Sequence, residues 1–201
     1  MWSKIFKKYL FDNIQFPKGY GYGEDYITQY LFHKANQSVF LPEEYYYYLQ
    51  RSDSTTCTKD ISRQLTNHRY FLDAWLDRFY FVEKYPEYHS VLPTVKLWVL
   101  RLGIHLLRNI IAFPEHFTVD VDKLFDMKSK QLLSIPLTAN DKLQCNLKID
   151  YYLLKYAGQR CYRMIRWLYI KNIRITNRLN ITNKRTGLLL YDLWGCLTKD
   201  L

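Results

Sequence analysis

Apolar and polar positions alternate with helical spacing over most of the chain. After residue 57 apolar side chains recur every three or four positions, which predicts a series of amphipathic helices. Proline ends several of these segments, because it cannot continue a helix beyond the first turn. The helices predicted in this way cover residues 58–84, 87–113, 119–133, 141–156, 158–179 and 187–197.

The first 56 residues follow a different pattern. Apolar side chains at helical spacing predict a short helix over residues 2–11, and a loop with one proline and three glycines follows over residues 13–23. Glu24 and Asp25 then open an amphipathic helix, where carboxylates favour the positive end of the helix dipole.

Two short apolar runs come next, over residues 38–41 and 45–49, and the turn Pro42-Glu43-Glu44 between them predicts two strands. We therefore expect an α+β protein that is mostly helical. Its mixed head covers residues 1–56, and a helical region over residues 57–201 packs on this head and shares its core.

The net charge and the cysteine pattern indicate which ligands and which cellular compartment to expect. The formal net charge of +10 on 201 residues predicts attraction to nucleic acid, anionic lipid or phosphorylated ligands. The four cysteines form no Cys-x-x-Cys pair, which favours reduced thiols in a cytoplasmic protein over a disulfide framework or a zinc site. The five histidines have no metal-ligand spacing either, so no metal site is predicted.

No membrane-spanning segment is predicted. The most apolar stretch, residues 95–113, is interrupted by Arg101, His105 and Arg108, which favours a buried or interfacial helix. The opening residues alternate lysines with apolar side chains and lack the continuous apolar core of a signal peptide.

The head resembles the second half of the catalytic domain of family 2 glycosyltransferases, which are inverting enzymes with a GT-A fold. In that family a lysine-bearing helix, a Phe-Pro-Gly loop, a Glu-Asp pair, a short strand, a Tyr-x-Tyr strand and an Arg-x-x-Ser-x-Thr loop follow one another. The corresponding residues here are Ser3-Lys4-Ile5-Phe6, Phe16-Pro17-Lys18-Gly19, Glu24-Asp25, residues 38–41, Tyr46-Tyr47-Tyr48 and Arg51-Ser52-Asp53-Ser54-Thr55.

The resemblance covers only the acceptor side of such an enzyme. The family's nucleotide-binding half, with the Asp-x-Asp motif that places a Mg²⁺ or Mn²⁺ ion on the donor diphosphate, has no counterpart in this chain. Asp120-Val121-Asp122 has the spelling of that motif but no strand ahead of it, and we interpret it as a helix start. We therefore expect a truncated GT-A head that needs no cofactor of its own, unless the chain belongs to a longer protein.

The resemblance implies a role for each matching residue. Asp25 would be the base that deprotonates the acceptor hydroxyl, with Glu24 in support, and Arg51 would hold the diphosphate leaving group. Additional contacts to donor or acceptor would come from Lys4, Ser54, Thr55 and Tyr47.

Each of these residues also has a plainer interpretation. The acidic pair could cap a helix, Arg51 could pair with Asp53, Lys4 could be solvated, and the tyrosines could fill core. The hydroxyl-rich loop around Ser54 could be an ordinary turn.

A basic segment lies near the end of the chain. Residues 151–186 hold nine lysines and arginines and no acid. At roughly 100° per residue, one helix side gathers basic side chains around a tryptophan, and apolar residues occupy the other side. This pattern allows a helix whose apolar side packs on the domain, contact with an anionic membrane surface, or the least favoured alternative, nucleic acid. The residues on the basic side are Arg160, Arg163, Trp167, Lys171, Arg174 and Arg178.

Two functions follow from the sequence. The first is a glycosyltransferase portion that acts in cell-surface polysaccharide synthesis, with a nucleotide-sugar donor and a saccharide or lipid-linked acceptor, and that is inactive alone. The second is a basic helical binding or scaffold protein in the cytoplasm, peripheral at the inner face of the membrane.

Overall fold

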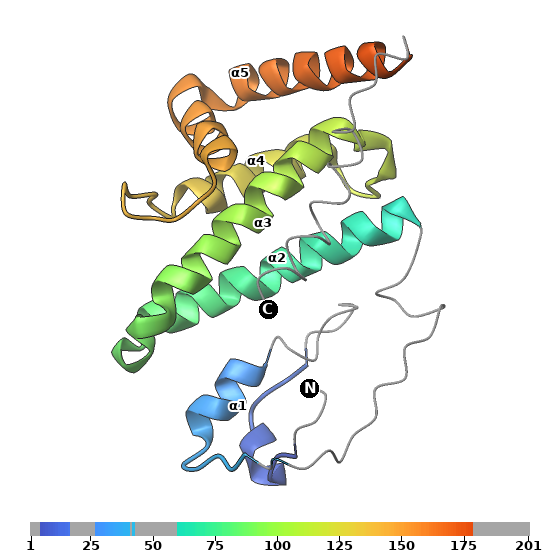
Figure 1. Cartoon of the computed structure of the whole chain (residues 1–201). Helices are drawn as coiled ribbons and strands as arrows, with labels where there is room; N and C mark the ends of the chain where they lie inside the picture. Colours follow the sequence, from blue (N-terminus) through green and yellow to red (C-terminus); the bar gives the residue numbers. More distant parts are fainter. Residues whose placement is uncertain (1–4, 17–26, 41, 43–59, 179–201) are drawn as a thin grey trace. The chain divides into compact units, whose positions relative to one another are not determined.

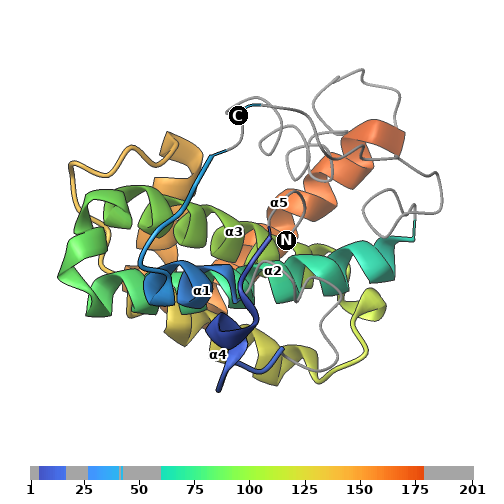
Figure 2. The same ribbon diagram turned by 90° about the horizontal axis from the view of Figure 1, so that it is seen from below.

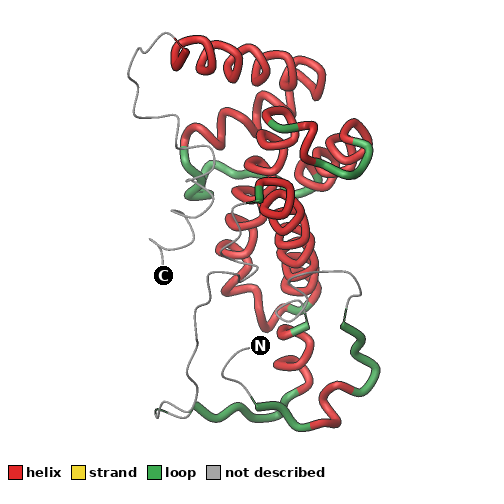
Figure 3. Tube along the Cα trace, turned by 90° about the vertical axis from the view of Figure 1, so that its right-hand side faces the viewer, coloured by secondary structure: helices red, strands yellow, loops and turns green. Residues whose placement is uncertain are grey.

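The computed structural model describes residues 5–16, 27–40, 42 and 60–178, with side chains described as far as residue 172. The chain divides into two compact units, Met1–Leu102 and Gly103–Leu201. The described residues form helices joined by loops, and none of them lies in a strand (Figure 3).

The first unit begins with two short elements that pack on each other. The 3₁₀ helix η1 covers Lys8–Phe11, and α1 covers Thr28–Lys34. In Figures 1 and 2 the two lie together at the blue end of the chain. The helix predicted over residues 2–11 is therefore a single 3₁₀ turn in its described part, and the helix predicted at the acidic pair begins at Thr28.

The long helix α2, Ile61–Lys84, has the helical pattern predicted for residues 58–84. Asp60 caps it by accepting a hydrogen bond from the backbone N–H of Ser62 at 3.0 Å. Its apolar stripe, which includes Leu65, Leu72 and Phe79, is buried. The helix ends at Lys84, and its C-cap Tyr85 lies just before Pro86, which has no N–H to continue the hydrogen-bond ladder.

The 3₁₀ helix η3, Pro86–Val91, leads into α3, Leu92–Ala112. The Trp75 and Trp98 rings stack with centroids 5.6 Å apart, which joins α2 to the first half of α3. Pro93 falls in the first turn of α3, where proline is tolerated because its missing N–H needs no partner within the helix.

The segment Pro86–Ala112 is the one described helix long and apolar enough to cross a membrane, by length and composition only. Half of its most apolar window is buried within the protein. His105 and Arg108, two of the residues that interrupt its apolar run, are both buried, at 8% exposure each.

The second unit contains the end of α3, the 3₁₀ turn η4 at Pro114–His116, α4 at Val121–Leu133 and α5 at Cys145–Arg178. Gly103 lets α3 approach α4 closely, since a Cβ at this position would lie 2.5 Å from Leu132 Cδ1. Tyr151 secures the loop after α4, because its hydroxyl donates a hydrogen bond to the Ile135 carbonyl at 2.9 Å.

The run α5 consists of two helices that meet at Gly158. This residue has φ 78° and ψ 167°, a conformation open almost only to glycine, and α5 turns sharply there in Figure 1. The predicted break between the helices over residues 141–156 and 158–179 is therefore confirmed, whereas the first of them begins at Cys145 and residues 141–144 are loop. The helix predicted over residues 187–197 lies outside the described residues.

The predicted α+β fold with a two-stranded GT-A head is wrong for the described part of the chain. Residues 38–40 of the first predicted strand are irregular, and Val39 and Phe40 are 81% and 88% exposed. A strand needs a neighbour that pairs its backbone, and no described residue supplies one. The second predicted strand, residues 45–49, and the predicted boundary at residue 56 lie outside the described residues.

Candidate functional site

The residues predicted to carry transfer chemistry all lie outside the described part of the chain. They are Asp25, Glu24, Arg51, Lys4, Ser54, Thr55 and Tyr47. Their roles therefore stay predictions, and the structure bears on them through the elements on either side.

The segment after Lys4 and the helix after Asp25 share a small apolar core. Leu10 of η1 packs with Ile27 and Leu31 of α1, and all three are buried, at 5%, 2% and 0% exposure. Phe6, Phe11, Ile14 and Ala35 complete this cluster. Ile27, the first described residue after the acidic pair, thus belongs to this core.

The N-cap of α1 is Ile27, whose apolar side chain makes no capping hydrogen bond. Glu24 and Asp25 precede the N-cap by three and two residues, and the first turn holds no acid. The acidic pair is therefore neither the N-cap residue nor part of the first turn of α1.

Helix α1 is held to α2 by a carboxylate. Asp77 accepts a hydrogen bond from Gln29 Nε2 at 2.7 Å and from the Tyr30 hydroxyl at 2.9 Å. A helix of seven residues is marginal by itself, so these contacts and the apolar core decide whether α1 forms.

An aromatic cluster extends this attachment. The His33 ring lies against Tyr85 with centroids 4.2 Å apart and against Phe81 at 5.5 Å. His33 Nδ1 is also 3.2 Å from the Tyr88 hydroxyl and 3.7 Å from a Glu87 carboxylate oxygen. These contacts explain His33 as a structural residue of the first unit.

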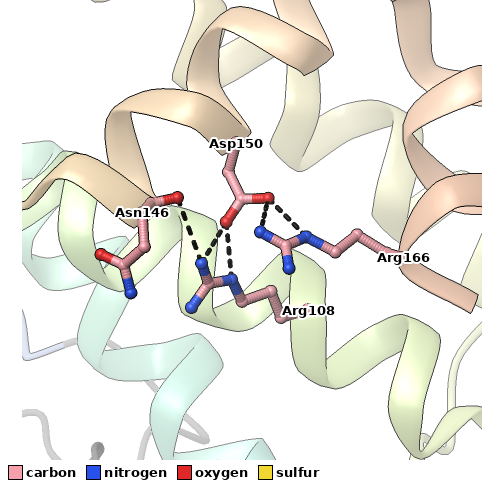
Figure 4. A network of polar contacts seen from close by, with 4 residues as sticks. All are labelled: Arg108, Asn146, Asp150 and Arg166. Atoms are coloured by element: carbon pink, nitrogen blue, oxygen red, sulfur yellow. Dashed lines mark hydrogen bonds and ion pairs between the residues drawn. The ribbon is translucent and has the colours of Figure 1, made fainter. Parts of the chain in front are cut away.

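The second unit contains a buried network of charges that the sequence analysis did not find (Figure 4). Asp150 is 1% exposed and lies between two guanidinium groups. Arg108 Nε donates to one of its oxygens at 2.7 Å, and Arg166 Nε donates to the other at 2.5 Å. Arg108 also donates to the Asn146 carbonyl at 3.4 Å. The one sequence signal was Arg108 itself, a charge within an apolar helix.

The electrostatics of this network favour a structural role. Burial is the largest single effect on the Arg166 pKa and lowers it, but the hydrogen bond to Asp150, the Asp150 charge and the contact with Tyr162 together outweigh burial and raise that pKa overall. Burial, with a smaller effect from the Asp150 charge, raises the pKa of the nearby Tyr162 hydroxyl. Because Asp150 accepts from a guanidinium at each oxygen, it is poorly placed to take a proton from a substrate.

A cleft of about 330 Å³ opens in the second unit beside the second half of α5. Its walls combine apolar side chains with one guanidinium group and one indole. The residues that line it are Ile110, Ile111, Pro114, Val121, Arg163, Met164 and Trp167. This composition suits an apolar chain or an aromatic ring better than a sugar nucleotide.

Asp120-Val121-Asp122 starts a helix, as predicted. Asp120 is the N-cap of α4 and accepts from the backbone N–H groups of Asp122 and Lys123 at 3.1 and 3.0 Å. The hydrogen bond from Lys123 is the main cause that lowers the Asp120 pKa. Asp122 pairs with Arg163 at 2.6 Å. With both carboxylates engaged in this way, the pair does not fit the metal site of a nucleotide-sugar donor.

Among the described residues, no group of three or more histidine, cysteine or acidic side chains could hold a metal ion. Cys145 and Cys161 are exposed free thiols. His68 is buried, and burial lowers its pKa to about 4.

Comparisons with family models, with curated proteins and with solved structures give no match for this chain.

Proposed function

We propose that this chain supplies the acceptor side of a family 2 glycosyltransferase, with Asp25 as the base. The observation that carries the proposal is the ordered series of six motifs within residues 3–55, which places an acidic pair after a glycine-rich loop and an arginine after a tyrosine-rich segment.

One feature of the described residues supports the proposal. The core of Leu10, Ile27 and Leu31 joins the segment that follows Lys4 to the helix that follows Asp25. This core agrees with a transferase head in which these two segments belong to one folded element.

In an inverting transfer, the acceptor oxygen bonds to the anomeric carbon of the donor sugar while the bond from that carbon to the nucleoside diphosphate breaks. Asp25 would take the proton of the acceptor hydroxyl, and Glu24 would orient that hydroxyl. Arg51 would stabilise the charge that grows on the departing diphosphate. Lys4, Tyr47, Ser54 and Thr55 would position the substrates.

The donor-binding part of the reaction needs residues that this chain does not supply. In the family that part also holds the divalent metal ion, which neutralises charge on the donor diphosphate. A cysteine pattern without Cys-x-x-Cys pairs supports a reaction in the cytoplasm, whose product would enter a cell-surface polysaccharide.

A completed protein tests the proposal. The donor-binding half of an active family 2 enzyme, through its Asp-x-Asp motif, is fused ahead of Met1, and this fusion is called the completed protein. Release of nucleoside diphosphate is measured with a panel of nucleotide sugars and with cell-envelope extract as acceptor. We expect turnover by the completed protein and none by the chain alone.

The variant Arg51→Met tests whether Arg51 stabilises the diphosphate leaving group. It should lower kcat of the completed protein by roughly 100-fold, the usual effect of removing one stabilising donor. A completed protein that binds nucleotide sugar but releases no diphosphate would contradict the proposal. Sugar transfer by the chain alone would show that no separate donor-binding half is required.

A further inference from the structure

The second half of α5 has a clearly defined inward side. Tyr162, Arg166 and Ile170 are spaced four residues apart and have little exposure: Tyr162 is 0% exposed, Ile170 is 9% exposed, and the Arg166 side chain is 17% exposed. Because Arg166 is bonded to Asp150, the rotation of the helix about its axis is fixed.

The opposite side of this helix exposes large apolar residues. Met164 and Leu168 are 57% and 51% exposed, and at roughly 100° per residue they fall opposite the inward row. Ile165, Trp167 and Tyr169 flank them at 41%, 50% and 55% exposure. The alternative in which the apolar side of this helix packs on the domain is therefore wrong for Ile165, Leu168 and Tyr169, because Arg166 and its neighbours in the inward row occupy the inward position.

A basic edge runs along one flank of the exposed apolar row. Arg160 and Lys171 are both exposed, and they fall on the same flank as Trp167. Lys171 Nζ lies 4.8 Å from the centroid of the Trp167 ring. Arg163 pairs with Asp122 at 2.6 Å, so we do not count it with this edge. No acidic residue occurs between residues 151 and 178.

The cleft described above continues the apolar surface. Met164 and Trp167 belong both to the exposed row and to the cleft wall, together with Ile110 and Pro114. The apolar surface is thus wider than one helix and includes a hollow that an acyl chain could enter.

We infer that the outward face of α5 binds the surface of bilayers rich in anionic phospholipid. Met164, Leu168 and Trp167 enter the boundary between headgroups and acyl chains, while Arg160 and Lys171 reach the phosphates. The combination of a central apolar row, an indole and a basic edge without acids is the pattern of a helix that lies in the plane of the interface.

Charge distinguishes an anionic bilayer from two other possible partners of this face, a second copy of the chain and nucleic acid. A second copy would bring an equally basic face, and the two would repel each other. Nucleic acid would meet the basic edge but would leave Met164 and Leu168 against a charged backbone. An anionic bilayer satisfies both the charges and the apolar row.

Vesicle sedimentation of the full chain tests the inference. Vesicles of phosphatidylcholine alone are compared with vesicles containing three parts phosphatidylglycerol to seven of phosphatidylcholine. We expect binding only to the anionic vesicles, and the bound fraction should fall as salt is raised. The double variant Arg160→Gln with Lys171→Gln should bind about 30-fold more weakly, since each basic residue near the surface contributes roughly fivefold.

The matched control is Lys7→Gln with Lys142→Gln, which removes the same net charge from exposed positions outside the face. It should lose less than about threefold, whereas Met164→Ser with Leu168→Ser should lose about tenfold with unchanged helix content. Phospholipids with brominated acyl chains should quench part of the tryptophan fluorescence of the wild-type chain. In Trp167→Phe this quenched part of the fluorescence should be missing.

Five results would overturn the inference. Equal binding to neutral and anionic vesicles, or equal losses in the two charge-neutralised variants, would remove the role of the basic edge. No binding to either vesicle would remove the lipid partner. A dimer in sedimentation velocity that dissociates in the Met164→Ser and Leu168→Ser variant would assign the face to a second copy, and RNA binding that depends on Arg160 and Lys171 without vesicle binding would assign it to nucleic acid.

Discussion

Single side chains in this protein show how burial decides the behaviour of polar groups. His68 lies on the buried stripe of α2, where burial disfavours its charged form and a hydrogen bond with the backbone of Leu102 opposes that effect in part. Asp150 is as deeply buried but remains paired, since Arg108 and Arg166 hold its two oxygens. The His68 imidazole therefore makes folding sensitive to pH, and the paired Asp150 carboxylate makes it sensitive to substitution.

Burial of His68 predicts that the protein loses stability in mild acid. Its pKa is about 4 in the folded chain against 6.5 for an ordinary histidine, so the unfolded chain binds more protons between these values. The contribution is therefore fully present above the unfolded pKa and is lost as the pH falls toward the folded pKa. Between pH 8 and pH 5 this loss amounts to about 2 kcal/mol of unfolding free energy.

Denaturant unfolding of His68→Leu at the two pH values measures this effect. The leucine variant should have a smaller dependence on pH than the wild-type chain. His116→Leu, which changes a partly exposed histidine of η4, is the control and should keep the wild-type dependence. An unchanged dependence in His68→Leu would assign the acid sensitivity to other groups.

Removal of the Asp150 charge should be strongly destabilising. Asp150→Asn leaves Arg108 and Arg166 buried and facing each other without a counter-charge, which costs about 3–5 kcal/mol. The midpoint of urea unfolding measures the loss. Lys130→Met breaks the 2.8 Å pair with Asp126 on the exposed side of α4 and should cost far less. Equal losses in the two variants would show that the buried network is not a special contributor.

At the scale of elements, short helices depend on the long helices beside them. The seven residues of α1 cannot sustain a helix by themselves, and Asp77 of α2 provides hydrogen-bond acceptors for two of their side chains. The second helix of α5 is placed in a similar way, by Gly158 at its start and by the bond from Arg166 to Asp150.

Asp77→Ala should therefore release α1 without unfolding the rest of the chain. Loss of the hydrogen bonds from Gln29 and Tyr30 should cost about 1–2 kcal/mol locally. Amide hydrogen exchange of residues 28–34 should then accelerate by roughly 10-fold. Exchange in α4 should stay unchanged, and Glu83→Ala, an exposed acid on the same helix, is the matched control. Uniform acceleration along the chain would contradict a local role for Asp77.

At the scale of the whole molecule, hydrophobic periodicity predicted the long helices well. The apolar stripe of α2, the stop at Pro86 and the break at Gly158 all follow from local rules, because a helix satisfies its own backbone hydrogen bonds. The strand predicted over residues 38–41 is absent from the described residues 38–40 for the opposite reason, since a strand depends on a partner that a local pattern cannot supply.

The candidate sites show the same difference between features set by local sequence and features set by contacts between distant residues. The role of Asp120 as a helix cap was predicted from its neighbours alone and is confirmed. The network around Asp150 and the exposed row at Met164 and Leu168 were not predicted, because they depend on which residues of distant helices meet. The spacing of residues along the basic helix predicted which side chains share a side of the helix. It did not predict which side faces the interior of the second unit.

The central claim is that Asp25 deprotonates an acceptor hydroxyl. The most direct measurement is the single-turnover rate of diphosphate release by the completed protein, with Asp25→Asn compared with Asp12→Asn, an exposed acid after η1. We predict that Asp25→Asn lowers the rate by at least about 100-fold, with donor affinity unchanged, and that Asp12→Asn has the wild-type rate. A wild-type rate in Asp25→Asn would contradict the assignment.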